Sequence, residues 1–218
     1  MIDRFISYCE NHLDFSIQAP IGYQSAPLCA LDSVFSIGVK YKSVENVVSN
    51  FLIFLGNLPM DTTISTSDVL DRIGNMSVDD LAVVLNRQRT STRGNSILKA
   101  EAFLRYLNIM QEFRIESCED VRNSIDNQDF HNQIKAIPGQ RSGLTLDYLY
   151  ILARVDNYVK VDRHITRFTC AATGVRNLTK DEIIHCIRTA ATYMSENNYY
   201  GMNARWLDHI IWTYQSGH

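Results

Sequence analysis

Apolar residues recur at helical spacing along most of the chain, and this periodicity restricts the possible folds more than any other feature of the sequence. In the segment 44–56, for example, Val44, Val47, Val48 and Phe51 fall on one face of a helix. Only four prolines and ten glycines occur among the 218 residues, and few runs alternate between apolar and polar residues as strands do. The sequence therefore predicts an all-α protein.

The predicted helices are mostly short, and many follow a residue that caps helix N-termini. Two begin with the capping pairs Ser117 with Asp120 and Thr179 with Glu182, and Asp162 is placed to cap another. No repeat and no low-complexity linker occurs, so we expect one compact unit over residues 1–218 whose two ends form a second lobe. The predicted helices cover residues 3–14, 26–37, 44–56, 66–74, 78–86, 95–113, 118–126, 128–136, 144–155, 162–172, 179–197 and 203–215.

The composition is that of a soluble globular protein, with 45% hydrophobic and 21% charged residues. No segment approaches the roughly 18 to 20 apolar residues that span a bilayer, and the N-terminus lacks the basic and apolar regions of a signal peptide. The five cysteines are odd in number and far apart, so no disulfide framework or CxxC metal motif can be recognised. We therefore expect no membrane insertion, and reduced thiols in a cytoplasm.

Charge is distributed unevenly, although the net charge is only −3. Residues 87–105 hold five bases and one acid, residues 135–167 hold six bases and three acids, and the remainder is strongly acidic. Binding to a polyanion depends on the local field rather than on the total charge. The two basic segments indicate either a nucleic-acid-binding surface or ordinary solvated helix faces, and charge alone leaves both interpretations open.

Most standard catalytic and cofactor-binding signatures are missing from the sequence. There is no GxGxxG, Walker loop, HExxH or GxSxG pattern. The six histidines are scattered, and no spacing brings histidine and cysteine together as a zinc site or a nucleophilic pair. We expect no metal site.

Residues 137–144, with the sequence Ile-Pro-Gly-Gln-Arg-Ser-Gly-Leu, lie between two helical patterns and predict a tight hairpin. Its glycines, Gly139 and Gly143, free backbone amides that can hold a phosphate together with the N-terminus of the following helix. Downstream, Asp162 follows the apolar Val161 at the start of a predicted helix, twenty-four residues beyond Pro138. The hairpin and the capping aspartate are each common in proteins, so only their combination at this spacing points to a function.

A hairpin, an apolar helix and a capping aspartate at this spacing resemble the helix-hairpin-helix DNA glycosylases of the endonuclease III superfamily. Those proteins have an LPG-type hairpin, an apolar helix and a V-D-x-H-x-x-R stretch, which residues 161–167 match closely. The hairpin departs from the pattern, because three residues separate Gly139 from Gly143 where the family usually has one. The resemblance covers about residues 26–174, is specific mainly over 137–168, and is nearest to an uncharacterised bacterial group with a PGQ-x-SG hairpin and a K-x-D-R stretch.

The resemblance implies a helix-hairpin-helix glycosylase fold with two helical lobes flanking a cleft. Residues 26–136 would form a lobe like a six-helix barrel, 137–168 the hairpin and catalytic segment, and 1–25 with 169–218 the second lobe. Asp162 would be the catalytic carboxylate, which stabilises positive charge on the sugar and orients a water; the alternative is an ordinary helix cap.

Two absences refine the activity that the resemblance implies. Relatives that also cut the strand carry a lysine at the start of the helix after the hairpin, where this chain has Gly143 or Leu144, so water would be the nucleophile. No cysteine follows Cys186, which excludes the iron–sulfur cluster of some relatives. We therefore expect no cofactor.

The expected function is that of a monomeric, monofunctional DNA glycosylase that removes a flipped, damaged or modified base from double-stranded DNA and leaves an abasic site. Base-excision repair and defence against foreign DNA both remain open, as does the identity of the base. The alternatives are a catalytically inactive helix-hairpin-helix DNA-binding module and an unrelated helical protein that binds a protein partner. The expected DNA contacts are Gly139, Gln140, Arg141, Ser142 and Gly143 in the hairpin, with Arg89 and Arg93 in the loop 87–95.

Overall fold

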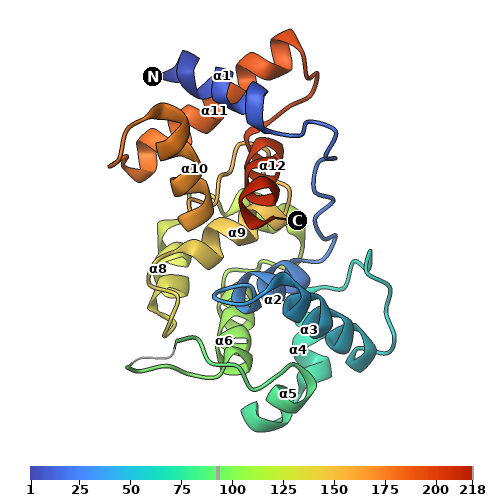
Figure 1. Cartoon of the computed structure of the whole chain (residues 1–218). Coiled ribbons are helices and arrows are strands. Elements are labelled where there is room, and N and C mark those ends of the chain that lie inside the picture. The colour runs from blue at the N-terminus through green and yellow to red at the C-terminus, as the bar shows by residue number, and fades with distance from the viewer. Residues whose placement is uncertain (92–93, 218) are drawn as a thin grey trace. The chain divides into compact units, whose positions relative to one another are not determined.

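The computed structural model describes residues 1–91 and 94–217, which form twelve α-helices and no strand beyond one isolated bridge (Figure 1). The predicted all-α class is confirmed, and every predicted helix is present. The helices are α1 (Ile2–His12), α2 (Ala26–Phe35), α3 (Tyr41–Phe54), α4 (Thr66–Ile73), α5 (Val78–Val84), α6 (Lys99–Glu112), α7 (Cys118–Asn123), α8 (Gln128–Ala136), α9 (Leu144–Leu152), α10 (Arg163–Thr173), α11 (Lys180–Asn197) and α12 (Ala204–Ser216).

Local capping signals located most helix starts correctly. Ser117 with Asp120 and Thr179 with Glu182 both form complete capping boxes. The main error is the start of α6, which was predicted at residue 95 but begins at Lys99. Residues before Lys99 are extended instead, because Thr90 N donates to Ile97 O and Lys99 N donates to Gln88 O. This pairing between residues 88–90 and 97–99 is a tertiary contact, which helical periodicity cannot predict.

The chain divides into two compact units, one of residues 1–21 with 155–218 and the other of residues 22–154. The division falls between Arg154 and Val155, so the hairpin belongs to one unit and Asp162 to the other, whereas the sequence grouping placed both in one segment, 137–168. The physical reason is α10, whose Ile165 and Phe168 are buried in the core of the first unit.

In the unit of residues 1–21 and 155–218, α1, α10, α11 and α12 pack around a shared apolar core. Phe168 lies at its centre and makes edge contacts with Phe5, Tyr8 and Tyr214. Burial of the aromatic rings supplies much of the driving force for this packing. The start of α10, capped by Asp162, is therefore carried on a well-packed helix.

In the unit of residues 22–154, α2 is buried along its whole length and packs against α3, α6 and α9. The Lys99 ammonium satisfies the end of this helix by donating to Phe35 O at 2.9 Å and Ile37 O at 2.8 Å. Burial lowers the pKa of Lys99 from 10.5 to about 8. Lys99 is 2% exposed, so it is a structural cation rather than part of a basic surface.

None of the helices in the described ranges 1–91 and 94–217 combines the length and apolar character needed to cross a membrane.

A buried polar network joins α8 to α9, the two helices that flank the hairpin. The Tyr150 hydroxyl donates to Ser124 O at 3.0 Å and lies 2.8 Å from His131 Nε2. Burial, with the nearby charge of Lys135, holds the pKa of His131 below its ordinary value of 6.5. The folded state therefore disfavours the protonated imidazole.

We predict that this network weakens in mild acid. Because the pKa of His131 is lower in the folded state, the unfolded chain binds more protons as the pH falls below about 6.5, and the free energy of unfolding decreases until the pH reaches the folded pKa. Urea unfolding at pH 7 and pH 5 should show a smaller loss of stability in His131→Gln than in the natural protein. An equal loss in both proteins would contradict the prediction.

Candidate functional site

The hairpin predicted from the sequence joins α8 to α9 through two successive turns. Gln140 N donates to Ile137 O at 2.9 Å, and Gly143 N donates to Gln140 O at 3.0 Å. Gly139 and Gly143 have positive φ values of 89° and 76°, a region that favours glycine. Arg141 and Ser142 are exposed, whereas the Gln140 side chain is 3% exposed. Arg141 and Ser142 therefore present the side chains that a ligand can reach.

Gly143 also forms the N-cap of α9 and supplies no side-chain cap to this helix. Leu144 N donates to Ser142 Oγ at 3.4 Å, and the first amide to take an intrahelical acceptor is that of Asp147, which donates to Gly143 O. The first amides of a helix have no acceptor within it and bind anions readily. The amides of Leu144, Gln140 and Gly143 already have acceptors, and Thr145 and Leu146 are buried. An anion at this turn would therefore meet chiefly the exposed Arg141 and Ser142.

The loop after α5 packs directly against this hairpin. A Cβ placed on Gly139 would overlap the Thr90 side chain, with Oγ1 only 2.7 Å away. The structure therefore brings together two segments that the sequence predicted separately as DNA contacts. Only glycine fits at position 139 without displacing the loop.

Several of the basic side chains near this loop already have partners. Arg89 is exposed, but its guanidinium donates to Ser96 Oγ at 2.9 Å and to Ser96 O. Arg87 pairs with Asp79 at 3.0 Å, and Arg105 pairs with Glu101 at 2.6 Å. Arg93, the other arginine predicted in this loop, lies outside the described residues. The positive field of residues 87–105 is weaker than the count of bases suggests.

Asp162 is the N-cap of α10, as predicted. Its Oδ1 accepts from His164 N at 2.8 Å and from Ile165 N at 3.1 Å. Both bonds use the same oxygen, so Oδ2 takes no part in the cap. The side chain is half-buried, which leaves the carboxylate partly accessible while the cap fixes its orientation.

The segment before Asp162 is held by α12 through two charged residues that sequence reasoning missed. Asp208 Oδ1 accepts from Lys160 N at 3.1 Å, and Lys160 O accepts from Asp162 N at 2.7 Å. Arg205 N donates to Asp156 O at 2.9 Å, and its guanidinium donates to Pro20 O at 2.7 Å. Arg205 and Asp208 are each 7% exposed. Their positions on an otherwise apolar helix face were the available signal, since buried charges need partners.

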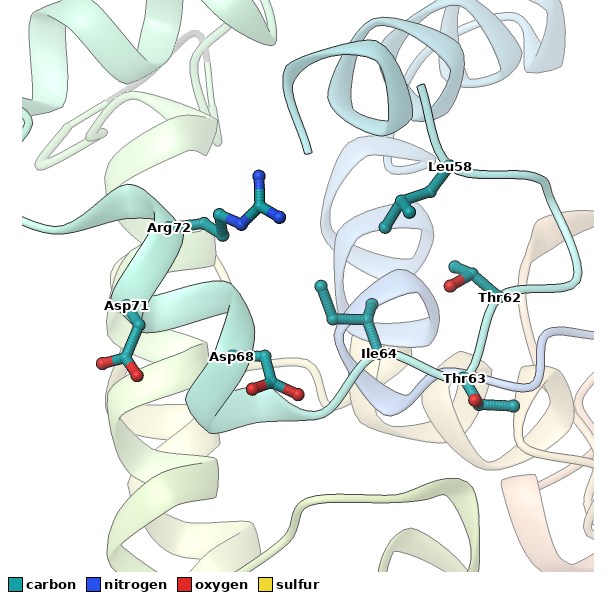
Figure 2. Close-up of a pocket in the computed structure, with 7 residues that line it drawn as sticks. All are labelled: Leu58, Thr62, Thr63, Ile64, Asp68, Asp71 and Arg72. Carbon is teal, nitrogen blue, oxygen red and sulfur yellow. The ribbon is translucent and has the colours of Figure 1, made fainter. Parts of the chain in front are cut away.

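Two open hollows lie on the described part of the chain, and Asp162 lines neither of them. One, of about 570 Å³, is lined by Leu58, Thr62, Thr63, Ile64, Asp68, Asp71 and Arg72 (Figure 2). A second, of about 350 Å³, lies beside the hairpin and is lined by Arg105, Asn108, Ile109, Gln133, Ala136 and Ile137. Within residues 1–91 and 94–217, no group of three or more metal-ligating side chains could hold a metal ion.

A family model described as a domain of unknown function (DUF8548) matches residues 3–216. The chain belongs to this family. The matched range includes the hairpin, Asp162 and α12, so the DUF8548 domain comprises both compact units. Comparisons with curated proteins and with solved structures gave no significant match.

The close approach of Thr90 to the hairpin yields a test. Gly139→Ala combines a strained positive φ with an overlap against Thr90, and we expect it to reduce stability by about 1–3 kcal/mol. Gly94→Ala is the matched control, because Gly94 also has a positive φ but has no atom within 4 Å of the added Cβ. Gly94→Ala should lower the free energy of unfolding only through backbone strain, by about 1 kcal/mol. Urea unfolding measures both, and equal losses would contradict the packing.

The bond from Lys160 N to Asp208 is tested in the same way. Asp208→Ala leaves a partly buried amide without its acceptor, and we expect a loss of about 1–3 kcal/mol in unfolding free energy. Asp208→Asn keeps an oxygen at the Oδ1 position and should lose less. Chemical denaturation measures the free energy of unfolding of both variants. If Asp208→Asn is as unstable as Asp208→Ala, the stabilisation comes from the carboxylate charge rather than from this hydrogen bond.

Proposed function

We propose that this chain has the helix-hairpin-helix glycosylase fold and acts as a monofunctional DNA glycosylase. The observation that carries the proposal is the conformation of Asp162, whose Oδ1 completes the helix cap while Oδ2 stays outside it. A carboxylate fixed in this way can act on a ligand without giving up its structural role. The exposed Arg141 and Ser142 of the hairpin supply the anion-binding element of the proposal.

The proposed chemistry is hydrolysis of the bond between a base and deoxyribose. As that bond breaks, positive charge develops on the sugar, and a fixed carboxylate stabilises the charge electrostatically. A water directed by Asp162 adds to C1′, its proton passes to the departing base, and an abasic site remains. Gly143 and Leu144 stand at the start of α9, so no amine at this position competes with water.

Anchoring of the DNA backbone is assigned to the hairpin. Arg141 and Ser142 are exposed there, and Lys135 on α8 lies nearby, with its Nζ 4.0 Å from the position of a Cβ on Gly143. On α10, Arg163 and Arg167 are also exposed, in the same turns that follow Asp162. Contacts to phosphate from these groups would make binding fall with salt. Arg89 would need to leave Ser96 in order to join them.

The proposed substrate is double-stranded DNA from which one nucleotide is extruded, because the glycosidic bond is inaccessible within the stacked duplex. The base is a damaged or modified one, and discrimination would depend on pocket shape and a few hydrogen bonds. We propose that the chain acts in the cytoplasm as a monomer without a cofactor. Duplexes with oxidised, alkylated, deaminated, mismatched and hypermodified bases form the panel that tests both repair and defence.

The decisive comparison is between Asp162→Asn and the natural protein. Asparagine also caps helices well, so the variant should keep its fold and its DNA binding, while the rate of abasic-site formation in a single turnover falls by about 10²-fold or more. Abasic sites are detected by strand cleavage in hot alkali. Asp162→Ala is the second control, since it also removes the cap and should lose about 0.5–2 kcal/mol of stability.

Each other outcome has a definite meaning. Equal abasic-site formation by Asp162→Asn and the natural protein would refute the assignment of Asp162. Salt-sensitive DNA binding without abasic product on any duplex would support an inactive DNA-binding module, in which Asp162 is only a cap. Absence of salt-sensitive DNA binding would favour a protein partner instead.

A further inference from the structure

Two buried cysteines from distant parts of the sequence face each other in the unit of residues 22–154. Cys29 on α2 and Cys118 at the start of α7 have their Sγ atoms 3.7 Å apart. Cys29 is fully buried and Cys118 is 7% exposed. The two sulfurs are therefore in van der Waals contact, and of the two residues only Cys118 keeps a small exposed fraction.

The surroundings give the two thiols different reactivity. The pKa of Cys118 lies below its ordinary value because Cys29 donates a hydrogen bond to it and because the charges of Arg122 and Arg154 together with this bond outweigh burial. Burial raises the pKa of Cys29. Cys118 is thus the more acidic thiol and Cys29 the less acidic one, an arrangement typical of a reactive cysteine and its resolving partner.

The other cysteines lack this combination. Burial raises the pKa of Cys9 and of Cys186 in the other unit. Cys170 is half-buried, and its Sγ lies 3.6 Å from Arg176 O. Among the chain's five thiols, the Cys29–Cys118 pair alone combines a second sulfur in contact, two nearby guanidinium groups and a partly exposed member.

We propose that Cys29 and Cys118 form a redox-active dithiol that a peroxide converts reversibly into a disulfide. The Cys118 thiolate attacks one peroxide oxygen, becomes a sulfenic acid and releases hydroxide. The Cys29 sulfur then displaces the sulfenic hydroxyl, and its proton and the expelled hydroxide form water. The hydroxide released in the first step takes up the proton that Cys118 lost on ionising. Two thiols are thus oxidised by two electrons in total, and one hydrogen peroxide is reduced to two waters. A small thiol such as glutathione reverses the reaction by exchange.

The geometry permits this bond with small rearrangements. The sulfurs must approach from 3.7 Å to about 2.05 Å, a movement of less than about 2 Å. The change occurs beside the segments where the chain enters and leaves this unit, because Cys118 Sγ lies 3.6 Å from Tyr23 O and Tyr23 N donates to Leu152 O. Disulfide formation would change the contact between Cys118 Sγ and Tyr23 O, which lies beside both connections.

The test uses the natural full chain and hydrogen peroxide. After treatment and removal of the oxidant, the protein is unfolded in guanidinium chloride with N-ethylmaleimide, and its intact mass is measured. We expect three maleimide adducts in place of the five given by the reduced protein, and a peptide map that links Cys29 to Cys118. If the oxidised protein is incubated with glutathione before it is unfolded and labelled, five adducts should be restored.

Two variants sharpen the result. Cys170→Ser leaves the pair intact and should still lose two reactive thiols, whereas Cys118→Ser should keep all four of its thiols at the same peroxide dose. The proposal is overturned if the natural protein keeps five thiols at doses that oxidise free glutathione, if the link joins another pair, or if Cys118 accumulates as a sulfinic acid. The test does not involve DNA, so its outcome is independent of the proposed glycosylase activity.

Discussion

A helix that is buried along its whole length needs protein partners for its polar groups, and this requirement on α2 organises the unit of residues 22–154. Ser25 at its N-cap donates to Ile64 O, the Asp32 carboxylate accepts from Tyr23, and Lys99 donates to the carbonyls at its end. These partners come from three separate segments of the chain. Polar contacts as well as apolar packing therefore connect α2 to the rest of this unit. The helix α9, which follows the hairpin, packs against α2.

A related arrangement supports Asp162 in the other unit. There the buried charges of α12 hold the extended segment before α10, and the Phe168 core holds α10 itself. Candidate ligand-binding groups in both units are thus carried on backbone that is fixed by buried polar contacts. Such support is what a site needs if its groups are to keep their geometry during a reaction.

Prediction from sequence succeeded where the information was local. Ser117, Thr179 and Asp162 act on the amides of the next few residues, so their roles follow from spacing alone. The hairpin was likewise predicted from its glycines. Prediction failed for Lys99, which was counted as a surface base, because its partners Phe35 O and Ile37 O are more than sixty residues away. The contact of Asp208 with Lys160 N spans 48 residues and that of Cys118 with Cys29 spans 89, and neither leaves a periodic pattern.

The sequence by itself determined the all-α class, the order of the twelve helices described, and most of the residues that begin them, because hydrophobic period and capping chemistry act within a few residues. Only the tertiary structure decided which charges are exposed, which are paired, and which cysteines meet. It also divided the chain between Arg154 and Val155. The reason is that burial and pairing depend on distances between segments far apart in the chain, which are settled only when the helices pack.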